Sequence, residues 1–340
     1  MTAKTLPSTA SFLDSACIII PTYNAGRYWD KLHASLVKQG IQSDQVLVVD
    51  SSSTDDTRDR VRKAGYRLKQ ITNESFRHGA TRQMASKIMP WTEFLVYLTQ
   101  DAVPTQADSI RNLLDAFTDP LVGAAYGRQV PRDAAGPIEA HSRLFNYADT
   151  SETRTLESRR SLGIKAAFCS NSFAAYRRKA FDDAGGFPED SIFAEDVSVA
   201  ARMLLGGWKI AYRADAIASH SHPLTVRKEF SRYFDIGVNH SREKWLIDEF
   251  GTAGGEGLRY VLSEMRYLWK QAPSLIPLAA IRTGGKWLAY QLGRHEALLP
   301  RSFVVAISAH PYFWDDHRVT VMPRPSEVEV PVRPAHAPRH

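Results

Sequence analysis

The stretch that decides the fold is Gln45–Asp56, QVLVVDSSSTDD, in which a run of β-branched residues ends at an aspartate. Similar apolar runs stand at Cys17–Ile20 and Phe94–Asp101, with a weaker one at Tyr66–Thr72. Runs this apolar are typical of strands that are buried on both faces, as in parallel sheets. Residues with helical spacing separate them, at Tyr28–Gly40, Asp55–Gly65 and Gly79–Met89. The alternation predicts an α/β fold whose mostly parallel, Rossmann-like sheet is flanked by helices.

Polar segments follow the strongest of these runs. They read PTYN at residues 21–24, DSSSTDD at 50–56 and TQDA at 99–102. Parallel strands end at one edge of their sheet, and ligands bind beyond that edge. We therefore expect the three segments to converge on one crevice.

Composition and charge narrow the class of protein and of partner. The chain has 340 residues, of which 44% are hydrophobic and 24% charged, as in an ordinary globular protein with a real core. The net charge of +6 and the pI of about 9.2 favour an anionic partner such as a nucleotide, nucleic acid or acidic lipid. Because the basic residues are spread along the chain and no nucleic-acid-binding module is recognisable, we expect no nucleic-acid partner.

Cysteine usage and the apolar segments indicate the compartment. Cys17 and Cys169 lie far apart and neither belongs to a C-x-x-C pair, which argues against a zinc site or a disulfide framework. The N-terminal residues lack the apolar core of a signal peptide. The closest approach to a membrane span, Ser274–Ile281, is too short to cross a bilayer. We expect a cytoplasmic protein without a transmembrane helix.

Candidate ligand contacts follow the strands, and each has a plainer alternative. Asp50 is placed to accept a hydrogen bond from the ring N–H of uracil or thymine, or it simply begins a loop rich in helix-capping residues. Thr22, Tyr23 and Asn24 are turn formers that become base contacts if the crevice exists. Asp101 ends an apolar strand, where a hard cation would bridge protein and diphosphate, but Asp-x-x-Pro also commonly starts a turn.

Two helix starts carry further candidates. His78 and Gly79 open a helix whose N-terminal amides would face a phosphate, with Arg82 one turn in; the alternative is a solvated helix face. Glu195 and Asp196 begin another helix after a Gly-Gly-Phe-Pro loop. A carboxylate there would act as a general base on a hydroxyl, although acids in a first turn also complement the helix dipole.

His220 and His222 follow a strand and stand two residues apart. On a strand this spacing puts both imidazoles on one face, and in a loop one or both would reach a metal. The alternative is a surface loop without a ligand.

In their joint order these motifs resemble glycosyltransferase family 2, the inverting enzymes with the GT-A fold. Within it the chain is similar to the bacterial rhamnosyltransferases that build O-antigen and related polysaccharides. The residues that carry the resemblance lie between Cys17 and Ser241 and read IIIPTYNAG, VLVVDSSSTDDT, FRHGATRQMA, LTQDAVP, YGRQVP, CSNSFAAYRR, GGFPEDSIFAEDVSVAARMLLGGWKIAY, ASHSH and RYFDIGVNHS.

The resemblance implies an inverting transfer of a sugar from a nucleotide-sugar donor to a hydroxyl of a glycan acceptor. L-rhamnose from dTDP-L-rhamnose is the first expectation, with a lipid-linked glycan of cell-surface polysaccharide synthesis as the acceptor. The alternatives are a UDP-sugar-dependent hexosyl or galactofuranosyl transferase of the same family and a non-catalytic nucleotide-sugar binder.

Roles for single residues follow from the same resemblance. Asp196 would be the catalytic base, with Glu195 supporting its position or contacting the acceptor. Asp101 matches the second aspartate of the family's metal-binding pair and would hold Mg²⁺ or Mn²⁺ together with His220, for which His222 is the competitor.

The first aspartate of that pair is replaced by Thr99. We therefore expect the cation to be held weakly unless the donor's own phosphates help to bind it. The residues expected to hold the nucleotide sugar are Thr22, Tyr23, Asn24, Asp50, Ser51, His78, Gly79, Arg82 and Gln100. Those expected on the acceptor side are Asn171 and Ser172.

The chain divides into four expected segments: a flexible N-terminus (1–14), a GT-A domain (15–223), a helical C-terminal region (224–320) and a disordered tail (321–340). Within the domain, residues 15–130 would hold the nucleotide sugar and residues 131–223 the acceptor. The proline-rich composition of the tail is typical of disorder.

The helical C-terminal region is basic. Between Arg259 and Arg301 it has seven Lys or Arg residues against two Glu, interleaved with aromatic residues such as Trp269 and Trp287. This pattern fits helices that lie on an anionic membrane surface, or a helical cap packed on the catalytic domain with its charges in water. The two interpretations are compatible, so peripheral attachment to the inner face of the cell membrane is one expectation.

Overall fold

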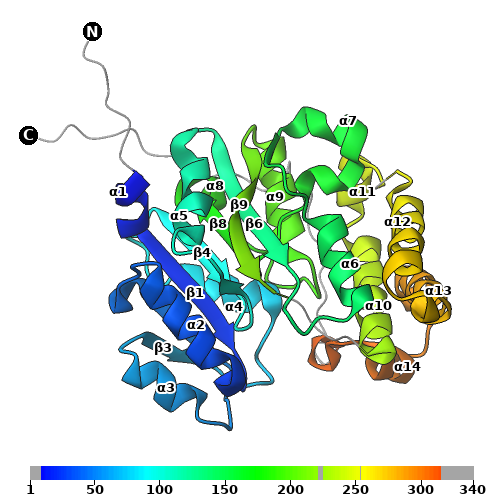
Figure 1. The fold of residues 1–340 in the computed structure, drawn as a ribbon, viewed down its shortest axis with the longest axis horizontal. Coiled ribbons are helices and arrows are strands. Elements are labelled where there is room, and N and C mark those ends of the chain that lie inside the picture. The colour runs from blue at the N-terminus through cyan, green and yellow to red at the C-terminus, as the bar shows by residue number, and fades with distance from the viewer. Residues whose placement is uncertain (1–8, 221–224, 253, 315–340) are drawn as a thin grey trace, which may run out of the picture.

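The computed structural model of the chain describes residues 9–220, 225–252 and 254–314, which form one central sheet with helices on both faces and a helical C-terminal region (Figure 1). The sheet has nine strands in the order β3-β2-β1-β4-β8-β6-β9-β5, and β7 pairs with β9. The strands are β1 (Ala16–Thr22), β2 (Val46–Asp50), β3 (Arg67–Gln70), β4 (Phe94–Leu98), β5 (Val103–Pro104), β6 (Val122–Val130), β7 (Glu152–Arg154), β8 (Phe173–Arg177) and β9 (Lys209–Ser219).

Strand direction decides where the site lies. The pairs β3–β2, β2–β1 and β1–β4 are parallel, as the sequence predicts. Beyond β4 the sheet is mixed, because β8 runs antiparallel to both of its neighbours while β6 and β9 are parallel to each other. The carboxyl ends of β1, β2, β4, β6 and β9 and the start of β8 therefore share one edge of the sheet.

Helices cover both faces of the sheet because alternate strand residues point to opposite sides. Ile19 packs in one hydrophobic cluster and Ile18 and Ile20 in the other. The helices are α1 (Thr9–Asp14), α2 (Gly26–Lys38), α3 (Thr57–Lys63), α4 (His78–Ser86), α5 (Ser109–Leu114), α6 (Pro137–Asn146), α7 (Arg159–Leu162), α8 (Arg178–Asp183), α9 (Glu195–Leu205), α10 (Val226–Arg242), α11 (Lys244–Phe250), α12 (Glu256–Gln271), α13 (Ile276–Arg294) and α14 (Arg301–Ile307).

The structure describes part of the N-terminal segment that we expect to be flexible (1–14), and its flexibility stays a prediction. Residues Thr9–Asp14 form helix α1, and Phe12 and Leu13 are buried. The ring of Phe12 meets that of Phe94 edge to face, with centroids 5.2 Å apart. Two large apolar side chains thus hold this segment against the sheet. The expected tail, 321–340, lies outside the described residues, and the other segment boundaries stay predictions.

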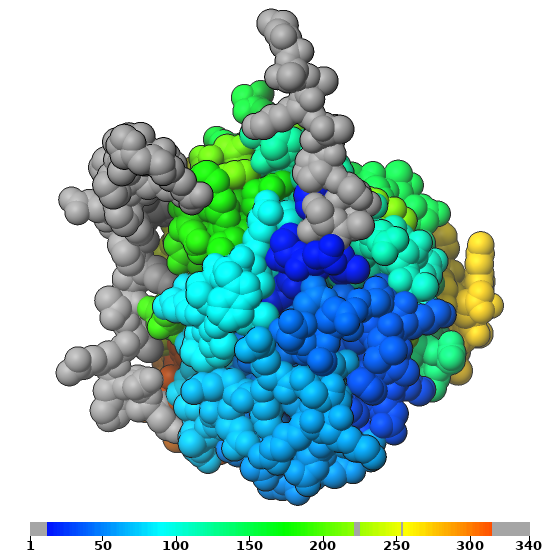
Figure 2. Space-filling model, turned by 90° about the vertical axis from the view of Figure 1, so that its left-hand side faces the viewer, coloured from blue at the N-terminus to red at the C-terminus, as the bar shows by residue number. Residues whose placement is uncertain are grey.

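The C-terminal helices contact one another and the N-terminal half of the chain. Helices α10 and α13 touch through glycines: a Cβ on Gly237 or Gly293 would overlap the backbone of the facing helix. After α14 the chain returns to the N-terminal half, where Arg77 donates to the Tyr312 carbonyl oxygen (2.6 Å). Figure 2 shows this end of the described chain bordering the N-terminal half. None of the helices described is long and apolar enough to pass through a bilayer.

A pair of alanine substitutions tests the glycine contact. Gly293→Ala should lower the free energy of unfolding by about 1–3 kcal/mol, because the added methyl group forces α10 and α13 apart. Gly284→Ala in the same helix is the control: a Cβ there meets nothing within 4 Å, so stability should stay the same or rise by up to about 1 kcal/mol. Denaturant unfolding of the two variants checks this, and equal stabilities would contradict it.

Candidate active site

The residue before helix α9 has an unusual backbone conformation. Ala194, the residue before the helix, has φ +60° and ψ 34°, a left-handed conformation that costs a non-glycine residue about 1–2 kcal/mol. Such strain persists only where surrounding contacts hold it, and it is common at functional sites. Glu195 and Asp196 follow it in the first turn of α9. They lie at the edge of the sheet where β1, β2 and β4 end.

Asn171, just before β8, holds both acids. Its backbone N–H donates to Asp196 Oδ2 (3.0 Å), and its side-chain Nδ2 donates to Glu195 Oε1 (3.0 Å). Its own Oδ1 accepts from the Tyr176 hydroxyl (2.7 Å), which fixes the orientation of the amide. Asn171 therefore positions the acid pair, and its expected place on the acceptor side stays a prediction.

Arg82 forms the other anchor of the acid pair. Its guanidinium lies 3.0 Å from Glu195 Oε1, and the two side chains are only 5% and 6% exposed. It also contacts the Nδ1 and carbonyl oxygen of His78. Arg82 thus has a buried carboxylate partner, Glu195 on the facing helix, and its expected contact with the diphosphate stays a prediction.

The electrostatics of Asp196 suit a general base. Burial, followed by the negative charge of Glu195, raises its pKa to about 7, while the N–H groups of Asn171 and Val197 and the charge of Arg82 pull it down. A base is most effective when its pKa lies near the working pH. Asp196 thus combines a fixed position with proton affinity in the neutral range.

Asp101 and His220 meet at the ends of β4 and β9. Asp101 Oδ1 is 3.5 Å from His220 Nε2, and both side chains are 5% exposed. The other ring nitrogen, Nδ1, is 2.7 Å from Gln129 Oε1, which accepts only, so Nδ1 carries a proton. Burial lowers the pKa of His220, and in the neutral ring Nε2 keeps its lone pair. A carboxylate and a lone pair facing each other fit a divalent cation. The competitor, His222, lies outside the described residues.

Thr99 offers a cation a neutral hydroxyl and no carboxylate. Its hydroxyl is buried without a hydrogen-bond partner, and its backbone N–H donates to the Ser172 carbonyl oxygen (3.3 Å). Across the described ranges, no three His, Cys, Asp or Glu side chains gather to form a metal site. The residues present thus offer two protein ligands, and the weak binding expected without donor stays a prediction.

Loops after β1, β2 and β4 are tied together at the same edge. Asp50 accepts from the Ser53 backbone N–H (3.0 Å) and hydroxyl and from the Thr22 hydroxyl (3.4 Å). Gln100 accepts from the Tyr23 N–H (2.8 Å) and donates to the Tyr23 carbonyl oxygen (3.1 Å). Asp50 therefore organises its own loop, and its role toward a base stays a prediction.

Asn24 and Ser51 belong to the same loop junction. Asn24 has φ +49°, and its side-chain oxygen accepts from the Thr54 N–H (2.8 Å). The Ser51 hydroxyl is buried and has no hydrogen-bond partner among the described residues. These contacts hold the loops together, and the predicted nucleotide contacts stay predictions.

His78 and Gly79 pack against other parts of the chain, and their expected contact with a phosphate stays a prediction. A Cβ on Gly79 would overlap the carbonyl oxygen of Pro188, so this position needs glycine for close approach of the α9 loop. The His78 ring meets His310 edge to face, with centroids 4.8 Å apart, and burial lowers the pKa of His78 well below its usual value. The N-terminus of α4 is therefore covered by other parts of the chain.

Two residues that sequence reasoning missed complete the site. Gln129 orients His220, and it lies in the GRQVP segment, to which no chemical role was attached. His310 packs on His78 from the far end of the chain, and nothing in the local sequence indicates that contact. Phe193 stacks on the His310 ring, with centroids 6.5 Å apart.

The sequence of this chain is similar to those of known proteins. A family model described as Glycosyl transferase family 2 matches residues 17–185. The chain is 43% identical over 300 residues to the O-antigen chain rhamnosyltransferase RfbN of Salmonella typhimurium, covering 88% of this chain and 96% of that protein. This chain belongs to glycosyltransferase family 2. It is also 43% identical over 305 residues to the O-antigen chain rhamnosyltransferase WbaN of Salmonella anatum, with coverage of 89% and 97%.

The fold agrees with that membership. The structure of the mannosyltransferase PcManGT from Pyrobaculum calidifontis, in complex with GDP-Man and Mn²⁺, superposes with a TM-score of 0.52 at 20% identity, covering 88% of this chain and 86% of that one. The predicted GT-A fold with a helical C-terminal region is confirmed. As a member of glycosyltransferase family 2 the chain is an inverting glycosyltransferase, so the predicted enzyme class is confirmed too.

The pH dependence of catalysis tests the acid pair. Asp196 acts as a base only when ionised, so kcat/KM should rise with pH through a limb near 7 and level off above it. Glu195→Gln removes a negative charge that helps to raise the pKa of Asp196, so the limb should move to lower pH. Glu157→Gln, an exposed acid elsewhere, is the control for the pH–rate profile. An unshifted limb in Glu195→Gln would contradict this electrostatic role.

Proposed function

We propose that this enzyme transfers L-rhamnose from dTDP-L-rhamnose to a hydroxyl of a glycan acceptor, with Asp196 as the base. Two relatives that are named O-antigen chain rhamnosyltransferases match this chain over nearly their whole length, which supports the donor. The observation that carries the chemistry is the fixed carboxylate of Asp196, whose pKa is raised to about 7. The backbone N–H of Asn171 holds this carboxylate in place, and the charge of Glu195 helps to raise its pKa.

The transfer then follows from the residues in place. Asp196 takes the proton of the acceptor hydroxyl as its oxygen bonds to the anomeric carbon from the face opposite the leaving group, which inverts the configuration. The bond to the nucleoside diphosphate breaks, and its electron pair stays on the leaving phosphate oxygen. Asp101 and His220 would hold Mg²⁺ or Mn²⁺, which when bound offsets the charge that develops on the leaving diphosphate.

A thermal-shift screen of nucleotide sugars tests the donor. Among dTDP-rhamnose, UDP-hexoses and UDP-galactofuranose, with and without Mn²⁺, only dTDP-rhamnose should raise the melting temperature, and Mn²⁺ should enlarge that shift. Asp196→Asn should keep the shift and lose about 10²–10⁴-fold in turnover, because only proton removal is affected. Asp101→Asn should lose the Mn²⁺-dependent part.

Each part of this experiment has an outcome that would contradict the proposal. A preference for UDP-sugars would overturn the donor assignment and favour the hexosyl or galactofuranosyl alternative. Near-normal turnover of Asp196→Asn would overturn the base. A large Mn²⁺ shift without any nucleotide sugar would contradict the weak cation site.

Helix α12 supports attachment to an anionic membrane surface, which would place the enzyme at the inner face of the cell membrane, in the cytoplasm. Leu258, Leu262 and Trp269 are 65%, 55% and 75% exposed, and their spacing puts them on one face of the helix. The exposed cations Arg266 and Lys270 flank that stripe. Apolar side chains with flanking cations are the pattern of a helix that lies in a membrane interface.

Flotation with liposomes tests the membrane contact. The double variant Leu262→Glu/Trp269→Glu should stay at the bottom of the gradient while the wild type floats with anionic vesicles, because buried carboxylates oppose insertion. Trp91→Glu is the matched control, since Trp91 is 67% exposed but lies outside the C-terminal helices. If all three proteins float equally, α12 is not the contact.

A further inference from the structure

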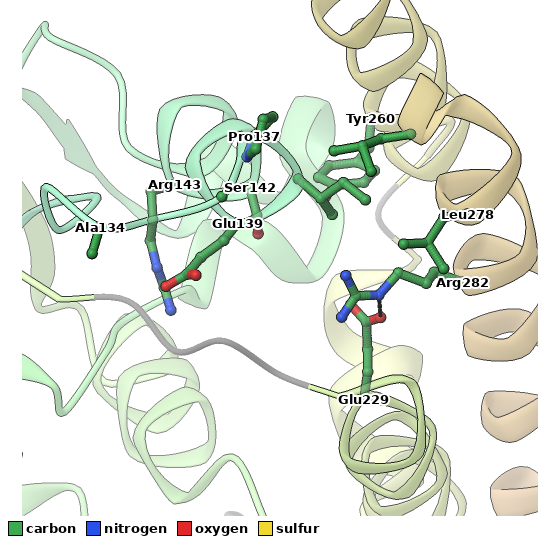
Figure 3. A pocket seen from close by; sticks show the side chains of 12 residues that line it. Ala134, Pro137, Glu139, Ser142, Arg143, Glu229, Tyr260, Leu278 and Arg282 are labelled. Atoms are coloured by element: carbon green, nitrogen blue, oxygen red, sulfur yellow. Dashed lines mark hydrogen bonds and ion pairs between the residues drawn. The ribbon is translucent and has the colours of Figure 1, made fainter. Parts of the chain in front are cut away.

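A cavity of about 310 Å³ lies where the catalytic domain meets the C-terminal helices. Figure 3 shows its two walls: Glu139 and Arg143 come from α6, and Glu229 and Arg282 come from α10 and α13. The lining residues are Ala134, Gly136, Pro137, Ile138, Glu139, Ser142, Arg143, Glu229, Tyr260, Leu275, Leu278 and Arg282. None of them has a role in the transfer described above.

The charged residues of the lining are two cations, Arg143 and Arg282, and two carboxylates, Glu139 and Glu229. Glu229 is shared between Arg282 Nε (2.9 Å) and Lys286 Nζ (3.0 Å). Glu139 lies 3.4 Å from Arg132. Among the described residues, Arg143 has no carboxylate partner; its guanidinium donates to the neutral amide oxygen of Gln129. A guanidinium that no carboxylate neutralises favours an anionic group beside it.

Arg143 connects the cavity to the catalytic centre. Its NH1 donates to Gln129 Oε1 (3.1 Å), and the same oxygen accepts from His220 Nδ1 (2.7 Å). The cavity is thus separated from the proposed cation site by one glutamine side chain. The buried Tyr147 gives a second link: burial raises its pKa most, Arg143 opposes that change, and the charge of Asp196 adds to it. The charges of Arg143 and Asp196 therefore both influence the pKa of Tyr147.

The opposite side of the cavity is apolar and leads to the surface of the C-terminal helices. Ile138, Leu275 and Leu278 line it. Leu278 is 38% exposed, and Ile281, one turn along α13, is 65% exposed. A ligand lying in the cavity would therefore meet cations at its inner end and aliphatic side chains at its outer end.

We propose that this cavity binds the phosphate end of a lipid-linked acceptor, with the phosphate at Arg143 and the first carbons of the apolar chain against Leu275 and Leu278. The proposal rests on the glycosyl transfer proposed above but not on the identity of the donor. A ligand that combines a phosphate with an aliphatic chain matches both walls, whereas a free glycan would match neither the cations nor the leucines. With its phosphate end here, the glycan part of the acceptor would extend past Gln129 toward Asp196.

Gly136 offers a way to test this without touching the catalytic residues. It lines the cavity, a Cβ there meets nothing within 4 Å, and its φ of −68° suits any residue. Gly136→Gln and Gly136→Glu add side chains of the same size and differ in charge. The carboxylate lies at the N-terminus of α6, where the helix dipole favours it, so both variants should fold.

The probes are geranyl diphosphate, geraniol and inorganic pyrophosphate, measured by isothermal titration calorimetry. Saturating dTDP and UDP are present so that the donor site is filled whichever nucleotide it takes. Geranyl diphosphate should bind the wild type and Gly136→Gln, and its affinity should fall about tenfold or more in Gly136→Glu, because the new carboxylate repels the phosphate and competes for Arg143. Geraniol and pyrophosphate should bind much more weakly than geranyl diphosphate.

Each other result counts against the proposal. No binding of geranyl diphosphate to the wild type, or equal affinity in the two Gly136 variants, would show that the cavity is not its site. Pyrophosphate binding as tightly as geranyl diphosphate would identify a site for free phosphate and remove the lipid. Since no sugar is transferred in this assay, a wrong donor assignment would leave these outcomes unchanged, whereas it would appear in the thermal-shift screen.

Discussion

The buried ion pair between Arg82 and Glu195 is the constraint on which the rest of the site depends. It joins α4, from the first half of the domain, to α9, from the second, across the edge of the sheet. Removing one partner of a buried pair leaves an uncompensated charge, a loss of about 3–5 kcal/mol. The pair therefore fixes how the two halves meet. Asn171 extends the same constraint to Asp196, so the base is positioned by the contact that joins the halves.

That arrangement also explains why the base is reactive. Glu195 raises the proton affinity of Asp196 by its charge, while Arg82 moderates the effect. A single isolated acid at the start of a helix would be stabilised in its ionised form by the helix dipole. Burial and a second carboxylate oppose that tendency, and the strained turn at Ala194 is one cost of placing both acids there.

Much of this architecture could be predicted from the sequence, for identifiable reasons. The buried strands β1, β2 and β4 are continuous apolar runs. Their positions and their parallel direction therefore follow from the local sequence pattern. The nearness of Asp101 and His220 could be anticipated because both follow strands that end at one edge. The partner of Arg82 could not, since an ion pair between two helices distant in the chain depends on how they pack. The antiparallel direction of β8 could not be predicted either, because its small and aromatic residues fit both orientations.

The return of the chain after α14 has a consequence for how the enzyme is made. Asp235 in α10 accepts from the Ser308 hydroxyl (2.8 Å) and the Ala309 N–H (3.0 Å), and Arg77 holds the Tyr312 carbonyl. His310, between these two anchors, covers His78, which contacts Arg82. The surroundings of the acid pair are therefore incomplete until nearly the whole described chain has left the ribosome. A nascent chain can build its sheet early, but it acquires the full active-site environment only at the end of synthesis.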